Sequence, residues 1–220
     1  MNLQVRSETE RQYNPIFLKI LEEIPGGVTI RTNRVPYKDK FLFPGTPLHA
    51  DTTSVGLYDI VKTARLKVNI DTANVVTIYV YASNLPNKPG NMFTVGDYIM
   101  LSDSGTAVTI TAITRGTLTN GVGTDIIVMT AASGGFNAAS VVTGTNLQQA
   151  YHHAHTGAYA LYTAQCVLGN TVRVRLESGT TLVNVSGQGV VRGTLKENIL
   201  PYGMPAEAVK TPLTARIRFA

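Results

Sequence analysis

Residues 107–113 read Ala-Val-Thr-Ile-Thr-Ala-Ile, in which Thr109 and Thr111 alternate with Val108, Ile110 and Ala112. Successive side chains on a β-strand point to opposite faces, so one face of this segment is expected to be buried and the other to be exposed to solvent. β-branched residues also favour strands over helices. The stretch therefore predicts an amphipathic strand and sets the expectation for the rest of the chain.

Strand patterns bounded by Gly, Asn, Pro or Ser recur on both sides of this segment. We expect further strands at residues 28–33, 41–43, 64–70, 75–82, 98–102, 124–131, 158–168, 171–177, 181–186, 189–194 and 214–219. The predicted fold is mainly all-β, with a β-sandwich or barrel base and an inserted small β-barrel domain.

Two short helices are expected near the ends of the chain. Ile16, Ile20 and Ile24 follow Pro15 at a spacing of four, which is typical of one helical face. The second helix is predicted at residues 205–210, where good helix formers lie between two prolines. The first helix is too short to stand alone, so its apolar stripe must rest on a core or on a neighbouring subunit.

The distribution of charge divides the chain. Residues 73–149 carry almost no charge and are dense in Thr, Gly, Asn and Ser, whereas the last third holds an excess of Lys and Arg. We expect an N-terminal arm at 1–27, a β base formed by 28–72 and 151–220, and an outer β-domain inserted at 73–150. Within the insert, residues 93–99 predict a turn that leads into a strand, with Gly96 at positive φ and Asp97 bonding to the local backbone.

Composition excludes several classes of protein. A single cysteine, Cys166, rules out an intramolecular disulfide or a cysteine-based zinc site, and its apolar surroundings predict a buried thiol. The first residues carry charge where a secretory signal would be apolar, and no apolar run approaches the ~20 residues that span a bilayer. We therefore expect a protein made and kept in a soluble compartment, with no membrane partner.

Catalytic motifs are missing from the sequence. It has no Gly-x-Ser-x-Gly elbow, His-Glu-x-x-His pair, phosphate-binding loop or dinucleotide fingerprint. Asp97, Asp103 and Asp125 could supply the acid and base of a glycosidase such as a depolymerase, but they lie among turn residues, where carboxylates usually bond to the backbone. We expect no enzyme activity and no cofactor.

The sequence 151–155, Tyr-His-His-Ala-His, is the most metal-like cluster in the chain. On a strand, His153 and His155 would share one face, and imidazole binds Zn²⁺ or Ni²⁺. No carboxylate lies near in sequence to orient these rings or His152, so a polar loop is the better interpretation and no metal is predicted. Convergence of the histidines on the axis of a symmetric trimer stays an open alternative.

Three segments share a pattern of two cations separated by an apolar residue. They are Arg65-Leu66-Lys67-Val68, Arg173-Val174-Arg175-Leu176 and Arg216-Ile217-Arg218-Phe219. The ordinary interpretation is a solvated face over a buried one. Since like charges opposed across strands are destabilising, three such strands side by side would instead need an anionic partner. We hypothesise that Arg65, Lys67, Arg173, Arg175, Arg216 and Arg218 bind an acidic protein surface.

Nucleic acid is not the expected partner, because Trp is absent and the tyrosines are scattered, so the aromatic platforms that stack bases are missing. A sugar-binding alternative places a glycan of the host surface against aromatic side chains in the insert. These residues are Tyr79, Tyr81, Phe93 and Tyr98, and core packing is the competing interpretation of all four.

Three motifs, in this order, resemble the head-fibre and capsid-decoration proteins of tailed bacteriophages. They are Phe-Pro-Gly-Thr-Pro-Leu at 43–48, Val-Lys-Thr-Ala at 61–64 and Asn-Met-Phe-Thr-Val-Gly-Asp-Tyr-Ile at 91–99, within a similar region that spans residues 28–144. The resemblance implies a virion protein made in the host cytoplasm and bound to the major capsid protein on the outer capsid surface. It also implies a homo-oligomer, with a trimer favoured, and carries over no catalytic residue.

Overall fold

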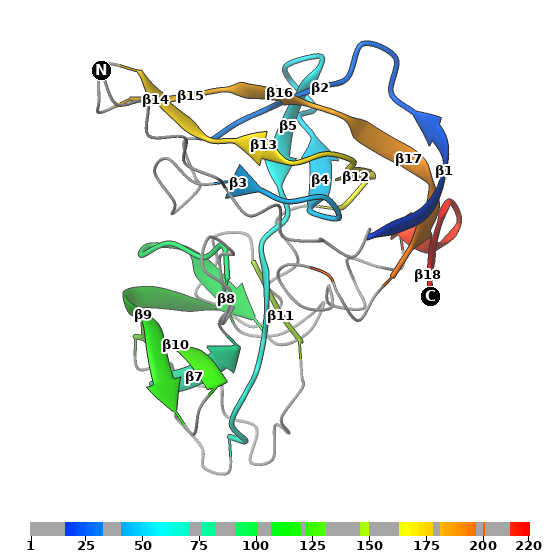
Figure 1. Cartoon of the computed structure of the whole chain (residues 1–220). Helices are drawn as coiled ribbons and strands as arrows, with labels where there is room; N and C mark the ends of the chain where they lie inside the picture. Colours follow the sequence, from blue (N-terminus) through cyan, green and yellow to red (C-terminus); the bar gives the residue numbers. More distant parts are fainter. Residues whose placement is uncertain are drawn as a thin grey trace, which may run out of the picture.

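The computed structural model describes residues 16–32, 41–70, 76–81, 91–100, 107–119, 122–130, 146–149, 163–177, 181–196, 200 and 212–220. These residues form two curled sheets, one above the other in Figure 1, which confirms the all-β class. The only helix among them is a single turn at residues 212–214. No helix in the described part of the chain is long and apolar enough to cross a membrane. The helix predicted at 205–210 and the histidines at 152, 153 and 155 lie outside the described residues.

The first sheet has the order β1-β17-β12-β4-β5-β2-β16, and β18 pairs in parallel with β17. Its strands are β1 (Phe17–Glu23), β2 (Val28–Ile30), β4 (Pro47–Ala50), β5 (Leu57–Ile60), β12 (Cys166–Leu168), β16 (Val185–Gly187), β17 (Gly189–Leu195) and β18 (Ile217–Phe219). Only Gln188 separates β16 from β17. Since β16 pairs with β2 and the start of β17 pairs with β12, this nearly continuous strand takes part at both ends of the strand order and curls the sheet round on itself.

The second sheet has the order β6-β11-β8-β9-β10-β7. Its strands are β6 (Thr63–Arg65), β7 (Thr77–Tyr81), β8 (Tyr98–Met100), β9 (Val108–Thr119), β10 (Val122–Met129) and β11 (Asn146–Gln149). This sheet also returns on itself, because Leu66 bridges to Val80 and the Lys67 N–H donates to the Tyr79 carbonyl at 2.8 Å. Two small pairs complete the described structure, β3 (Phe41–Leu42) with β13 (Val172–Arg173) and β14 (Arg175–Glu177) with β15 (Thr181–Val183).

Each sheet encloses its own apolar core. Ile30, Leu48 and Cys166 belong to the core of the first sheet, and a second cluster around Val190 and Ile217 covers its other side. The core of the second sheet includes residues of the 107–113 segment that alternate as predicted, with Val108 and Ile110 buried.

The helix predicted over residues 16–24 is wrong, because this segment forms strand β1. Phe17 pairs with Leu195 and Glu23 with Val190, so the backbone groups that a helix would satisfy internally bond instead to β17. The spacing of four is misleading, since Ile16 and Ile24 pack against two different apolar clusters and Ile20 is exposed. The predicted N-terminal arm at 1–27 thus contributes an edge strand to the base.

The chain changes sheet earlier than the predicted boundary between residues 72 and 73. Strand β5 ends the contribution of this segment to the first sheet at Ile60, and β6 begins the second at Thr63. Between them lies Lys62, which is 2% exposed. Its Nζ donates to Asp97 Oδ2 at 2.6 Å and to Thr94 Oγ1 at 3.1 Å. The crossing point is therefore fixed by a buried ion pair.

The predicted turn at 93–99 is present and lies at the same crossing. Gly96 has φ 91°, the Thr94 N–H donates to Asp97 Oδ2 at 2.7 Å, and β8 follows. Just before this turn, Met92 packs into the core of the first sheet and Phe93 into the core of the second. Two adjacent side chains thus join the two cores.

Loss of the Lys62 ammonium should destabilise the whole chain. We expect Lys62→Met to lower the free energy of unfolding by about 3 to 5 kcal/mol, because it leaves the Asp97 carboxylate in a mostly buried site without its cation. Urea denaturation measures the change, with the exposed Lys19→Met as a matched control that should stay within about 0.5 kcal/mol of the parent protein. Equal losses in the two variants would contradict a stabilising role for the ion pair.

Candidate functional site

The three basic segments do not lie side by side. Arg65 is on β6 in the second sheet, Arg173 on β13 and Arg175 on β14 in the two small pairs, and Arg218 on β18 in the first sheet. Arg216 precedes β18 in a turn. Strands that share a sequence pattern therefore have different neighbours, and the like-charge argument for a common anionic partner loses its geometric basis.

Lys67 differs from the other predicted binding residues, because its charge is directed into the second sheet. It is half-buried, and its Nζ donates to the hydroxyl of Thr124 on β10. Arg65, Arg173, Arg216 and Arg218 are exposed. Lys67 therefore contributes to the closure of its own sheet.

A new group of cations appears on the first sheet, around β17. Lys19 on β1 and Arg218 on β18 both pair with Thr194 of β17, from opposite sides. Paired residues share a face, so these three side chains form one row, in which the backbones of Lys19 and Arg218 are about 10 Å apart across two strand spacings. We call Lys19, Thr194 and Arg218 the basic row. Neither cation of the row has an ion-pair partner in the described part of the chain.

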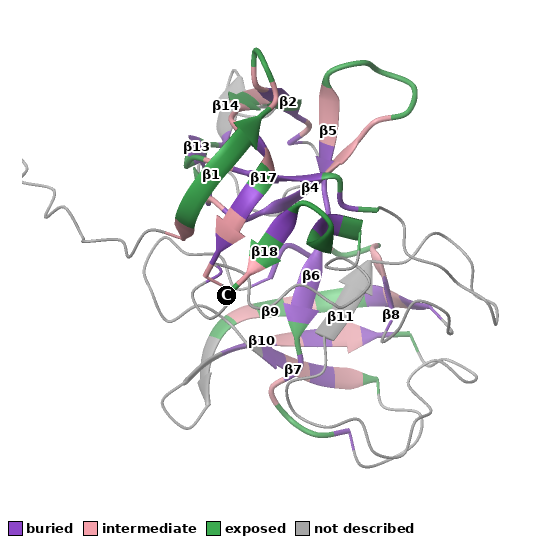
Figure 2. Ribbon diagram, turned by 90° about the vertical axis from the view of Figure 1, so that its right-hand side faces the viewer, coloured by how far each residue is buried: buried purple, intermediate pink, exposed green. Residues whose placement is uncertain are grey.

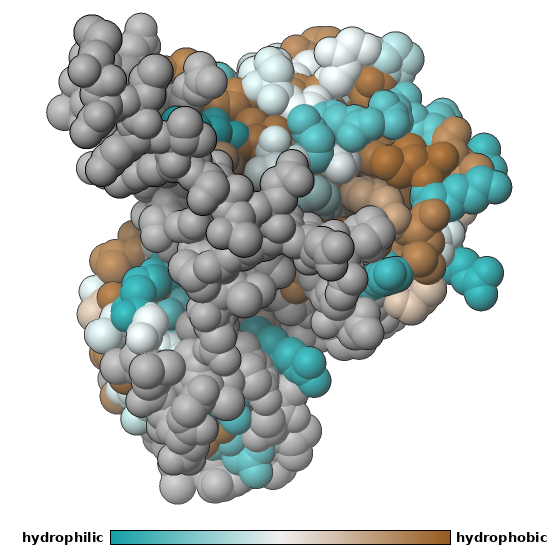
Figure 3. Space-filling model, viewed as in Figure 1, coloured by the Kyte–Doolittle hydropathy of each residue, from teal (hydrophilic) through white to brown (hydrophobic). Residues whose placement is uncertain are grey.

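Strand β1, at the edge of this sheet, is exposed along almost all of its length, and Figure 2 shows it in green. It pairs with β17 on one side, and no strand among the described residues pairs with its other side. Leu18 is 54% exposed, Ile20 37% and Leu21 56%. In Figure 3, hydrophobic atoms gather among hydrophilic ones over the β1 and β17 edge at the right. A bare apolar edge strand is uncommon, because it invites pairing with another chain.

The acidic side chains of the same edge balance only part of its positive charge. Glu22 Oε2 lies 3.7 Å from Arg192 Nη1, and both side chains are more than half exposed. An ion pair of this kind contributes little to stability. Glu22 and Glu23 are at the far end of β1 from Lys19, beyond Ile20. The basic row therefore lies at the less acidic end of the edge.

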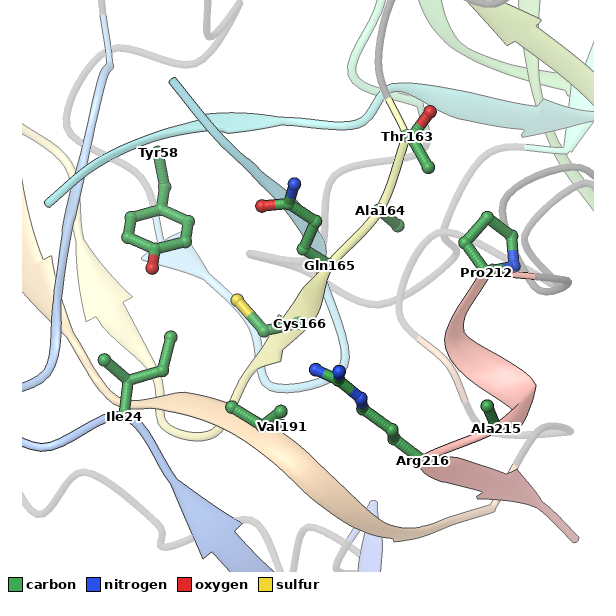
Figure 4. A pocket seen from close by; sticks show the side chains of 10 residues that line it. All are labelled: Ile24, Tyr58, Thr163, Ala164, Gln165, Cys166, Val191, Pro212, Ala215 and Arg216. Atoms are coloured by element: carbon green, nitrogen blue, oxygen red, sulfur yellow. The ribbon is translucent and has the colours of Figure 1, made fainter. Parts of the chain in front are cut away.

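A cavity of about 520 Å³ opens beside this edge (Figure 4). Its inner wall is formed by Ile24, Tyr58, Cys166 and Val191, which belong to or pack against the core of the first sheet. Its outer wall and floor are formed by Thr163, Ala164, Gln165, Pro212, Ala215 and Arg216. All but Ala164 of this second group are exposed. The cavity is thus lined by apolar side chains of the core on its inner side, and it opens to solvent at a rim that includes polar residues.

Burial raises the pKa values of the two titratable side chains on the inner wall. Burial raises the pKa of the Cys166 thiol to about 12, and burial together with the neighbouring Cys166 raises the pKa of the Tyr58 phenol. Both groups are neutral at physiological pH. Cys166 is therefore a buried apolar residue, as predicted, and the charge of the cavity comes from Arg216 at its rim.

The described carboxylates predicted as a candidate acid and base have structural partners. Asp97 pairs with Lys62, and Asp125 Oδ2 accepts from Arg115 Nη1 at 3.1 Å and from Asn91 Nδ2 at 2.7 Å. A third group lies on the first sheet, where Arg31 donates to both Asp59 and Asp51. Hydrogen bonds from Thr53, together with the Arg31 contact, hold the pKa of Asp51 well below its ordinary value. Asp103 lies outside the described residues.

No group of three or more His, Cys, Asp or Glu side chains in the described residues could hold a metal ion. His49, the one histidine described, has its Nδ1 2.8 Å from the carbonyl of Thr163. The aromatic residues predicted for a sugar site are also largely occupied. Phe93 is fully buried in the second core, and Tyr98 packs against Met100 and Ala107. Tyr79 is half-buried, and the Tyr81 side chain lies outside the described structure.

Comparison with models of known protein families, with curated proteins and with solved structures finds no match to this chain. The resemblance to head-fibre and capsid-decoration proteins stays a prediction.

Sequence reasoning identified Arg216 and Arg218 but missed Lys19, the exposed face of β1 and the cavity. The basic row depends on β1 and β18 flanking β17, although they are separated by most of the chain. The one available signal was the run Phe17-Leu18-Lys19-Ile20-Leu21, in which a cation interrupts apolar residues. A helix predicted for this run gives no indication that it forms the edge of a sheet.

The burial of Cys166 makes its reactivity a test of the inner wall. We expect iodoacetamide to modify the native thiol at least about a thousandfold more slowly than the unfolded one, because the thiolate fraction falls tenfold for each unit of pKa above 9.0. The raised pKa also has a consequence for stability. Between pH 9 and 12 the native thiol keeps a proton that the unfolded thiol has lost, so stability falls as the pH rises through this window.

Urea denaturation at increasing pH measures this loss, and Cys166→Ala should lose the part of the pH dependence that the thiol contributes. Rapid alkylation of the native protein, or an unchanged pH profile in Cys166→Ala, would show that the Cys166 thiol is not buried.

Proposed function

We propose that this chain is a structural protein of a phage particle, attached to the outer surface of the capsid through contacts with the major capsid protein. The observation that carries the proposal is the edge strand β1, which exposes Leu18, Ile20 and Leu21 and, within the described part of the chain, has no strand on its outer side. It lies next to the cations of the basic row, which have no ion-pair partner among the described residues. Such an edge suits a protein that acts by contact with another protein. The motif resemblance at 43–48, 61–64 and 91–99 supports a head-fibre or decoration protein as the class.

The chemistry of the edge indicates what kind of partner surface it fits. Leu18, Ile20 and Leu21 provide apolar area, and full burial of a leucine contributes about 1.5–3 kcal/mol. The unpaired backbone groups of an edge strand can bond to an extended segment of a partner. Lys19 and Arg218 favour a partner surface that carries acidic side chains beside the apolar contact.

The proposed orientation follows from the positions of the two sheets. The first sheet carries β1 and the basic row and faces the capsid. The second sheet, in the lower part of Figure 1, is displayed outward. A homotrimer is the proposed assembly, and no catalytic step is part of the proposal.

Replacement of the exposed leucines of β1 tests the attachment surface. We expect Leu18→Asp with Leu21→Asp to reduce binding to particles that lack this chain by more than about tenfold, because apolar contact is lost and two carboxylates enter the interface. Lys19→Glu with Arg218→Glu should reduce binding by a similar factor, and increasing salt should weaken the parent complex. Co-sedimentation of the purified chain with the particles measures occupancy.

Two matched variants on other surfaces serve as controls. Val76→Asp changes an exposed apolar residue that directly precedes β7 of the second sheet, and Arg65→Glu reverses an exposed charge on that sheet. Both should bind as the parent chain does. Full occupancy by the β1 and basic-row variants, with the fold intact by circular dichroism, would refute attachment through this edge.

A further inference from the structure

The structure assigns a ligand class to the cavity between Tyr58 and Arg216. We infer that it binds an acidic peptide segment, with an apolar side chain in the hollow and the adjacent carboxylate on the Arg216 guanidinium. The inference deepens the proposed function, since it identifies the part of a protein partner that this edge would hold.

The inner wall determines the apolar half of the ligand. Ile24 and Val191 present aliphatic side chains, Cys166 presents a neutral thiol, and Tyr58 presents an aromatic ring (Figure 4). A hollow of about 520 Å³ falls in the size range of small-ligand sites, and it can hold one large aliphatic side chain with its neighbours. None of the described residues on this inner wall is charged, so a charged group of the ligand is better placed at the rim, near Arg216.

The rim determines the polar half. Arg216 extends from the C-terminal turn toward Cys166 and Gln165 (Figure 4). Within the described part of the chain its guanidinium makes no hydrogen bond or ion pair, and no acidic side chain lines the cavity. A guanidinium binds a carboxylate through two parallel hydrogen bonds, which favours an Asp or Glu side chain over a neutral one.

Gln165 provides a second polar contact at the rim. Its Oε1 accepts from the Ala50 N–H at 3.1 Å, which orients the amide, and its N–H groups make no hydrogen bond to the described residues. A peptide carbonyl is an acceptor that suits such a donor. Five of the ten lining residues are exposed, so the backbone of a peptide can remain outside while a side chain enters.

The position of the cavity connects it to the proposed attachment surface. Ile24 directly follows β1, and Val191 precedes Arg192 on β17. Arg218 of the basic row is two residues from Arg216. A partner segment that contacts the edge of β1 can therefore reach the cavity without crossing the second sheet.

Binding of blocked pentapeptides to the full-length chain tests the inference. The probe is Gly-Leu-Glu-Leu-Gly, compared with Gly-Leu-Gln-Leu-Gly and with the small carboxylate hexanoate. Methyl NMR follows the signals of Ile24 and Val191 and gives the dissociation constants. We expect the Glu peptide to shift these signals and to bind about tenfold or more tightly than the Gln peptide, because only the carboxylate forms the charge-assisted pair.

Two variants and one matched control locate the contact. Arg216→Gln should weaken the Glu peptide by about tenfold and leave the Gln peptide unchanged, and Ala215→Leu should weaken both by filling the hollow. Arg65→Gln removes an exposed charge on the second sheet, away from the cavity and the basic row, and should change the affinity less than twofold. Equal loss in Arg216→Gln and Arg65→Gln would reduce the effect to general electrostatics and overturn the inference.

Other outcomes also overturn it. The site is not as inferred if neither peptide shifts the methyl signals, if the shifts lie elsewhere, or if Glu and Gln peptides bind equally. Hexanoate binding as tightly as the peptide would make it a small-carboxylate site. Failure of the peptides while the β1 variants still lose particle binding rejects the cavity alone. Success of the peptides while the β1 and basic-row variants keep full occupancy rejects the proposed attachment alone.

Discussion

The ion pair between Lys62 and Asp97 lies where the chain passes from one sheet to the other, and the arrangement of both sheets depends on it. A buried ammonium is costly unless a carboxylate and further hydrogen bonds satisfy it, and here Asp97 and Thr94 do so. The same turn follows Met92 and Phe93, which fill the two cores from adjacent positions. Relative movement of the sheets would therefore break the ion pair and withdraw an apolar side chain.

With the two sheets curled round, few strand edges are left for other chains. In the first sheet, β16 pairs with β2 and the adjoining β17 pairs with β12. In the second sheet, Leu66 and Lys67 pair with residues of β7. Closure removes free edges, which otherwise promote association. Among the described residues, strand β1 pairs with β17 along one side and with no strand along the other. Its open side can form main-chain hydrogen bonds with another chain.

Local patterns were sufficient for the parts of the fold that local chemistry decides. The alternation at 107–113 predicted β9, and Gly96 with Asp97 predicted the turn before β8. The segment 17–23 was misassigned because its conformation is decided by a strand more than 160 residues away in the chain. The same reason separates the three basic segments, whose common sequence says nothing about which strands become their neighbours. Pairing between distant strands is non-local information that a single sequence does not display.

Arg216 and Arg218 differ because Arg218 lies within β18 and Arg216 lies in the turn just before it. Arg218 pairs with Thr194, so its direction is fixed by the pleat and it joins Lys19 in the basic row. The backbone N–H of Arg216 donates to the Leu213 carbonyl at 2.9 Å within the turn, its carbonyl accepts from the Gly193 N–H of β17 at 3.2 Å, and its side chain is directed toward Cys166 (Figure 4). That difference lets Arg216 reach the cavity while Arg218, two residues on, stays on the sheet surface. A partner that bound both Arg216 and Arg218 would need two acidic groups. One would lie on its surface, opposite Arg218, and the other on a segment that reaches Arg216 at the cavity.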